Sequence, residues 1–171
     1  TPDLPAPTVE FILNNLHEIN QLLELKNRAI NAIQKECIDY LQEALGGKPV
    51  TSRINQWHGY PAIRFALDSW QDKQHKQYPK YDVVLYLDAR GEKTFCINYY
   101  IYGIQNEDQH AVVVSEMKQE DCTRTWRESN DTIACFQVTL ASTDQNQMFE
   151  AVAEKMRLVD RFEHDVRSKW D

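Results

Sequence analysis

The sequence predicts an α+β fold: an antiparallel meander sheet of about five strands, with long N-terminal and C-terminal helices packed on it. Residues 8–45 and 144–170 repeat apolar side chains every three or four positions, which is typical of amphipathic helices. Residues 50–141 instead contain short runs with a period of two, as strands do. The connections between these runs are too short for crossover helices, which favours antiparallel pairing.

The N-terminal helix is predicted over residues 8–45, because Thr8 can cap its start, no Gly or Pro interrupts it, and Gly46-Gly47 ends it. A straight helix of this length would measure about 55 Å, whereas a compact domain of this size is about 40 Å across. We therefore expect the helix to bend near Leu25-Lys26-Asn27, to project, or to pair with a partner. Its stripe comprises Val9, Ile12, Leu16, Ile19, Leu23, Ile30, Ile33, Cys37, Tyr40 and Ala44.

The strands are predicted in AIRFAL, YDVVLYLD, TFCINYYIYGI, AVVVSEM and TIACFQVTL. Asp88–Gly91 and Asn106–Gln109 are expected to form the turns around the third of these segments. We expect a helix layer over one face of this strand and leave open whether the other face is covered or open to a ligand. The first face carries Phe95, Ile97, Tyr99 and Ile101, and the second carries Cys96, Asn98, Tyr100 and Tyr102.

The C-terminal helix has cap candidates in Ser142, Thr143 and Asp144. Its apolar stripe is expected to face the sheet or the first helix. The stripe comprises Phe149, Val152, Met156, Val159, Val166 and Trp170.

The 171 residues carry a net charge of -7 and suit one domain over 1–171, either complete or part of a larger protein. The four cysteines lack metal-ligand spacing, so we interpret them as reduced thiols and expect a cytoplasmic location. We find no signal peptide and no apolar span, and therefore expect neither secretion nor membrane insertion.

The sequence carries no motif for a reaction or a cofactor. It lacks a nucleophile elbow, a glycine-rich phosphate loop and zinc-ligand spacing, and its five histidines stand singly. We therefore expect no cofactor, no metal and a non-catalytic protein.

The segment KYDVVLYLDARGEKTFCINYY resembles the metal-binding hairpin of PD-(D/E)XK nucleases, with Asp82 entering the hairpin. That family has an acidic residue and a lysine on the second strand, where this chain has Ile97, Asn98 and Tyr99. A degenerate nuclease domain is therefore one alternative. It requires further carboxylates near Asp82, from Asp88, Glu92 or Glu116.

The basic charge concentrates in residues 46–80, which carry about +4 in an otherwise acidic chain. Cations among aromatic residues suit nucleic acid, since cations meet phosphates and flat rings stack on unpaired bases. The alternative is that the two tryptophans belong to the core and the lysines to a solvated loop. The candidate nucleic-acid-binding residues are Arg53, Trp57, His58, Tyr60, Arg64, Trp70, Lys73, Lys76 and Lys80, with a second cluster of Arg124, Trp126 and Arg127.

The order of N-terminal helix, GYPAIRF strand, polar loop and paired YDVVLYLD and TFCINYYIYG resembles the DNA-recognition domains of modification-dependent restriction proteins. The resemblance implies a non-catalytic module that senses bases while another domain cuts.

Our first hypothesis is thus a recognition domain that binds DNA or RNA through residues 53–80. The second is a protein-interaction or dimerisation module, such as a toxin-neutralising or assembly protein, that uses the stripe over residues 9–44 to contact a partner or a second copy.

Overall fold

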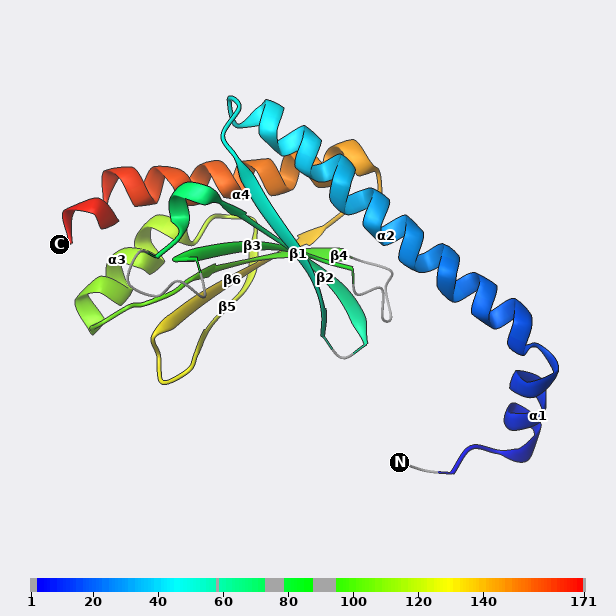
Figure 1. Cartoon of the computed structure of the whole chain (residues 1–171). Coiled ribbons are helices and arrows are strands. Elements are labelled where there is room, and N and C mark those ends of the chain that lie inside the picture. The colour runs from blue at the N-terminus through cyan, green and yellow to red at the C-terminus, as the bar shows by residue number, and fades with distance from the viewer. Residues whose placement is uncertain (1–2, 58, 73–78, 88–94, 171) are drawn as a thin grey trace.

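A computed structural model describes residues 3–57, 59–72, 79–87 and 95–170. Its six-stranded antiparallel sheet has the strand order β1-β2-β3-β4-β6-β5 (Figure 1). This arrangement confirms the α+β class, with one strand more than expected. The strands are β1 (Val50–Trp57), β2 (Tyr60–Leu67), β3 (Tyr81–Tyr86), β4 (Phe95–Ile101), β5 (Cys122–Glu128) and β6 (Ile133–Leu140).

Strands β2, β3 and β4 match the first three predicted segments and form an antiparallel meander, as predicted. Strand β1 extends the sheet beyond the five predicted segments and pairs with β2, with Arg53 opposite Arg64. The alternation along β2 buries Ile63 and Phe65 on the helix side and directs Arg64 to the other side, as the sequence predicts. The predicted turn at Asp88–Gly91 lies outside the described residues.

The prediction of a strand at AVVVSEM is wrong, because this segment belongs to helix α3 (Glu107–Met117). Asn106 caps the helix by accepting the Gln109 N–H at 2.9 Å, so the predicted turn there is instead a helix start. Val113 and Met117 lie one helical turn apart and are both buried. Capping and packing therefore override the strand preference of three consecutive valines.

The N-terminal helix divides at Asn15 into α1 (Ala6–Asn14) and α2 (Leu16–Ala44), not near Leu25-Lys26-Asn27 as predicted. The Asn15 side-chain amide donates to the Phe11 carbonyl at 2.8 Å. A side chain that bonds to a nearby backbone carbonyl competes with regular helix geometry, which accounts for the break.

The C-terminal helix, α4 (Gln145–Asp165), packs on the sheet together with the second half of α2. Asp144 caps it by accepting the Gln147 N–H at 3.0 Å, and a short 3-10 turn, η2 (Arg167–Lys169), follows it. Another 3-10 turn, η1 (Asp68–Trp70), follows β2.

The main core lies between this helical layer and one face of the sheet. Phe65, Tyr99, Phe136 and Met156 are fully or almost fully buried there. Burying one such side chain stabilises the fold by about 1.5–3 kcal/mol. Of the helices in the described ranges, none is both long enough and apolar enough to cross a membrane.

Candidate functional site

The face of the sheet opposite the helices carries a second, smaller apolar cluster, which we call the aromatic face. None of its residues comes from a helix among the described residues: all lie on strands except Tyr102, which directly follows β4. It comprises Trp57, Ala62, Val84, Tyr86, Cys96, Tyr100, Tyr102, Trp126, Ile133 and Cys135.

The rings of the aromatic face contact one another across four strands. Trp57 lies edge-on to Tyr86 and Tyr100, with centroids 6.0 and 6.3 Å apart. Tyr100 also stacks on Tyr102 at 6.2 Å and meets Trp126 edge-on at 6.3 Å. Such aromatic pairs contribute about 0.5–1.5 kcal/mol beyond their buried area, so the rings hold each other in place.

A buried ion pair lies beneath these rings. Arg64 donates to Asp82 at 2.8 Å, and the Tyr102 hydroxyl donates to the same carboxylate oxygen at 3.0 Å. Burial raises the pKa of Asp82, and the charge of Arg64 opposes that shift. The Arg64 guanidinium also lies 5.9 Å from the Trp57 ring and 5.7 Å from the Tyr100 ring, within cation-π range.

A cavity of about 600 Å³ opens beside this ion pair. Its volume suits a small organic ligand or one nucleotide. Four cationic side chains and one carboxylate line it, which favours an anionic ligand. The lining residues are Arg53, Asn55, Arg64, Asp72, Pro79, Lys80, Tyr102, Gly103, Ile133 and Arg167.

Arg167 enters the cavity from η2, after the C-terminal helix. Its guanidinium lies over the rings of Tyr81 and Trp170, at 5.2 and 5.8 Å. Its Nη1 atom is buried and has no hydrogen-bond partner among the described residues. Gly103, at φ +72°, leaves room for it, because a Cβ there would lie 3.0 Å from Nη2. A buried donor without a partner in a cationic cavity suits an anion.

The structure brings seven of the twelve candidate residues to the side of the sheet that carries the aromatic face. Arg124 lies 4.8 Å from the Trp126 ring, and Arg53 lies 3.7 Å from Asp82. The seven are Arg53, Trp57, Tyr60, Arg64, Lys80, Arg124 and Trp126. His58, Lys73 and Lys76 lie outside the described residues.

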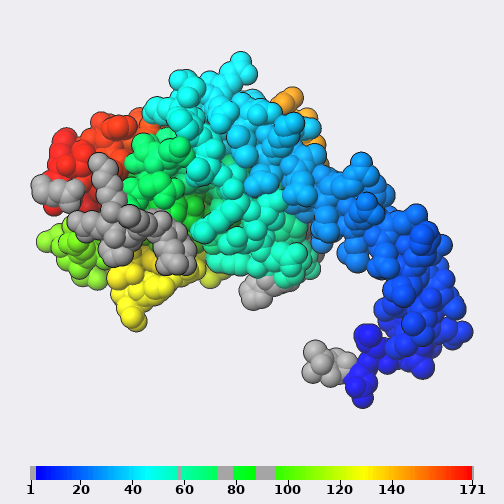
Figure 2. All heavy atoms as spheres, in the orientation of Figure 1, coloured from blue at the N-terminus to red at the C-terminus, as the bar shows by residue number. Residues whose placement is uncertain are grey.

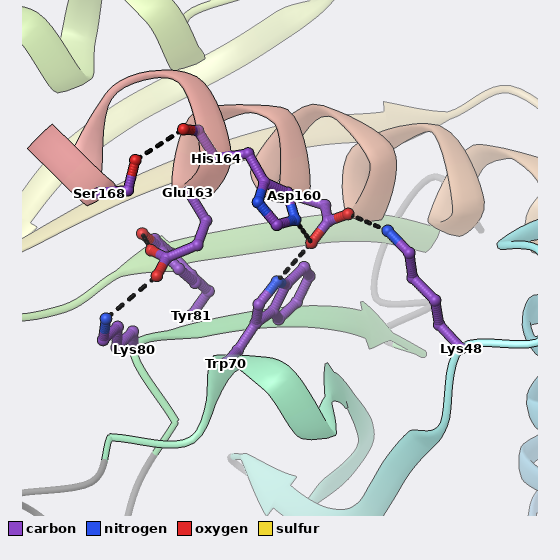
Figure 3. Close-up of polar contacts among 8 residues, drawn as sticks. All are labelled: Lys48, Trp70, Lys80, Tyr81, Asp160, Glu163, His164 and Ser168. Atoms are coloured by element: carbon purple, nitrogen blue, oxygen red, sulfur yellow. Dashed lines mark hydrogen bonds and ion pairs between the residues drawn. The ribbon is translucent and has the colours of Figure 1, made fainter.

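Trp70 belongs to the main core, which corrects its expected place on a binding surface. It is fully buried, and its indole N–H donates to Asp160 on α4 at 3.1 Å (Figure 3). Asp160 also pairs with Lys48. Lys80 lines the cavity but already pairs with Glu163 at 3.0 Å, so it is not a freely available cation.

Arg127 lies on the opposite side of strand β5 from Trp126. Its guanidinium donates to both carboxylate oxygens of Glu107 at 3.0 and 2.9 Å and to His110 at 2.8 Å. These contacts lower the pKa of Glu107, mainly through the hydrogen bonds from Arg127. Arg127 therefore joins β5 to α3 instead of facing the cavity.

The contacts of Asp82 do not favour the degenerate-nuclease alternative. Its carboxylate is occupied by arginines and a tyrosine hydroxyl. Glu116 lies on α3, in the layer on the other side of the sheet, and Asp88 and Glu92 lie outside the described residues. Across the described ranges, no three His, Cys, Asp or Glu side chains cluster in a way that could hold a metal ion.

Sequence reasoning did not select Arg167, Asn55 or Tyr102 for the site. The alternation through β4 assigned Tyr102 to the same face as Tyr100, and this was the one sequence signal for any of these three residues. Arg167 had none, because it lies about 100 residues from the basic segment and reaches the cavity only through the packing of α4. No protein-family model, curated protein or solved structure matches this chain.

Proposed function

We propose that the chain is a non-catalytic domain that recognises a nucleic acid through the cavity and the adjoining aromatic face. The observation that carries the proposal is the convergence of Arg53, Arg64, Lys80 and Arg167 on one cavity. Arg53 and Arg167 would contact phosphate, and Lys80 would do so only by leaving its pair with Glu163. The rings of Trp57 and Trp126 would stack on an unpaired base.

The cationic groups differ in what they could offer an anionic ligand. Arg167 has a buried guanidinium nitrogen to offer. Arg64 is already ion-paired with Asp82, so it would contribute as a positioned hydrogen-bond donor more than as a net charge. The acidity of the whole chain does not oppose this proposal, because the local charge governs close contacts once salt screens distant groups.

Fluorescence anisotropy with labelled single-stranded and double-stranded oligonucleotides at several salt concentrations tests the proposal. We expect binding that weakens with salt, and a double-logarithmic slope that falls by about 1 for each phosphate-contacting cation removed. The variants are Arg53→Ala, Arg167→Gln and Lys73→Ala/Lys76→Ala, the last pair addressing the predicted loop contacts.

Lys118→Ala is the matched control, because Lys118 is an exposed cation at the end of α3, away from the cavity. Its affinity and salt slope should equal those of the unmodified chain. Thermal unfolding of each variant separates lost contacts from lost stability. No binding to any oligonucleotide at low salt would overturn the proposal.

A second candidate function is protein interaction through the N-terminal helices. Leu13, Leu22 and Leu25 are each more than half exposed. Contiguous apolar surface on a protein is typical of an interface. We propose that this surface contacts a partner chain.

A further inference from the structure

We infer that the N-terminal helices pair with a second copy of this chain in antiparallel orientation. The inference rests on the second candidate function above and is independent of nucleic-acid binding. The surface concerned is the N-terminal arm, defined as residues 3–29. Figure 2 shows this segment, in blue, extending away from the rest of the molecule.

No residue of the N-terminal arm is buried. Within the apolar stripe, Leu16 is 46% exposed and Leu23 is 52% exposed, although both are as apolar as the residues of the core. Side chains of this kind lose free energy by remaining in water, so a continuous row of them favours burial against another surface.

The apolar stripe of the arm continues the face with which α2 packs on its own domain. Cys37 and Leu41 of that face are buried, and Ile30 and Ile33 are partly covered. The same three-four spacing extends outward through Leu23, Ile19 and Leu16. Because this spacing is the heptad pattern of a coiled coil, a second helix fits along it.

The charges of the arm favour a second copy in antiparallel orientation. Residues 3–18 contain Asp3, Glu10 and Glu18 and no Lys or Arg. Farther along α2, Lys26 and Arg28 outweigh the single acidic residue Glu24, so this part of the arm carries a net positive charge. An antiparallel pair brings these cations beside the acidic segment of the other copy, and the opposed helix dipoles add to the attraction.

The position of Lys26 supports the same orientation. Lys26 is the one charged residue within the stripe. In a parallel pair in register, the two Lys26 side chains would face each other in one layer. In an antiparallel pair with Ile19 opposite Leu23 of the partner, each Lys26 lies at an end of the contact. In that position the methylene groups of Lys26 can cover Leu16 of the other copy, while the ammonium group reaches water.

Sedimentation equilibrium of the chain over a range of concentrations tests the inference. We expect a reversible dimer. Leu16→Gln/Leu23→Gln should make it monomeric with unchanged circular dichroism, because both side chains are exposed and support no core. Val112→Gln is the matched control, since Val112 is an exposed apolar residue on α3, and its dimer should persist.

Charge reversal tests the orientation. Lys26→Glu/Arg28→Glu should raise the dissociation constant on the order of tenfold, because each arm then presents only acidic groups to the other. Adding Glu10→Lys and Glu18→Lys to the same chain should restore pairing. A monomer at all concentrations, or a dimer insensitive to the stripe or to charge reversal, would overturn the inference. A monomer that still binds oligonucleotides would leave the proposed nucleic-acid function standing.

Discussion

The indole of Trp70 donates a hydrogen bond to Asp160 at 3.1 Å and thereby joins the turn after β2 to α4 (Figure 3). Both residues are buried. The bond anchors the start of the segment that leads toward Pro79 and Lys80 at the cavity. It also removes Trp70 from the surface on which a base could stack.

Replacement of Trp70 by Phe should lower stability without changing oligonucleotide affinity. The variant loses the donor to Asp160 and part of the packing against Tyr81, which lies 5.5 Å away between ring centroids. We expect a loss of about 2 kcal/mol in the free energy of unfolding, measured with urea. A large loss of affinity in a variant of normal stability would contradict the assignment of Trp70 to the core.

Replacement of Arg64 by Gln should destabilise the fold strongly. Asp82 is 3% exposed and would lose its closest cation, leaving Arg53 at 3.7 Å. Removing one member of a buried pair costs about 3–5 kcal/mol. We expect the free energy of unfolding to fall by about 3 kcal/mol.

A double-mutant cycle tests whether the loss comes from the pair itself. Adding Asp82→Asn to Arg64→Gln should recover part of the stability, because no isolated buried charge then remains. Arg124→Gln serves as the control, since Arg124 is an exposed arginine on the same face of the sheet, and its effect should stay within about 0.5 kcal/mol.

The contact between α2 and α4 should weaken in acid through Glu150. This carboxylate accepts a hydrogen bond from the Tyr40 hydroxyl and pairs with Arg157 at 2.8 Å, and both contacts lower its pKa. A carboxyl with a lowered folded-state pKa contributes stability above its unfolded pKa, and the contribution disappears as the pH falls through the folded value.

The variant Glu150→Gln measures this contribution. At pH 7 it should be less stable than the unmodified chain by about 1 kcal/mol, given that the group is partly exposed. As the pH falls through the lowered pKa of Glu150, the two chains should converge. Urea unfolding at pH 7, 5 and 3 provides the comparison, and a constant difference across that range would be inconsistent with the assigned role.

The four cysteines should differ in reactivity. Cys37 and Cys135 are fully or almost fully buried, and burial raises the pKa of each to about 12. Iodoacetamide at pH 8 should therefore modify Cys96 and Cys122, which are partly exposed, before the buried pair. Mass spectrometry of the native and urea-unfolded chains gives the order. Early labelling of Cys135 would indicate that the aromatic face opens in solution.

The elements that sequence reasoning predicted well are those in which one period dominates. The alternation along β4 correctly assigned Tyr99 to the core and Tyr100 to the other face. Hydrophobic periodicity gave the wrong element at AVVVSEM, because a run of valines fits both a strand and a helix. The cap at Asn106 favours the helix. Periodicity also did not select β5, because CTRTWRE is polar and lies at the edge of the sheet.

The candidate site was predicted in part for a similar reason. Neighbouring strands bring Arg53 opposite Arg64, so closeness in sequence became closeness in space. Trp70 and Arg127 lie just as near to the basic and aromatic clusters in sequence, yet a 3-10 turn and the strand pleat direct them elsewhere. The composition of a segment does not determine which side of the sheet each of its residues faces.

The sequence by itself determined the α+β class, the two terminal helices and the apolar stripe of the first one, because local periodicity and caps act within a few residues. Only the tertiary structure decided that Arg167 reaches the cavity beside Arg53 and Arg64, that Asp82 is an ion-pair partner, and that Trp70 is buried. The physical reason is that each of these contacts joins residues from separate elements, whose relative placement depends on how the helices pack against the sheet.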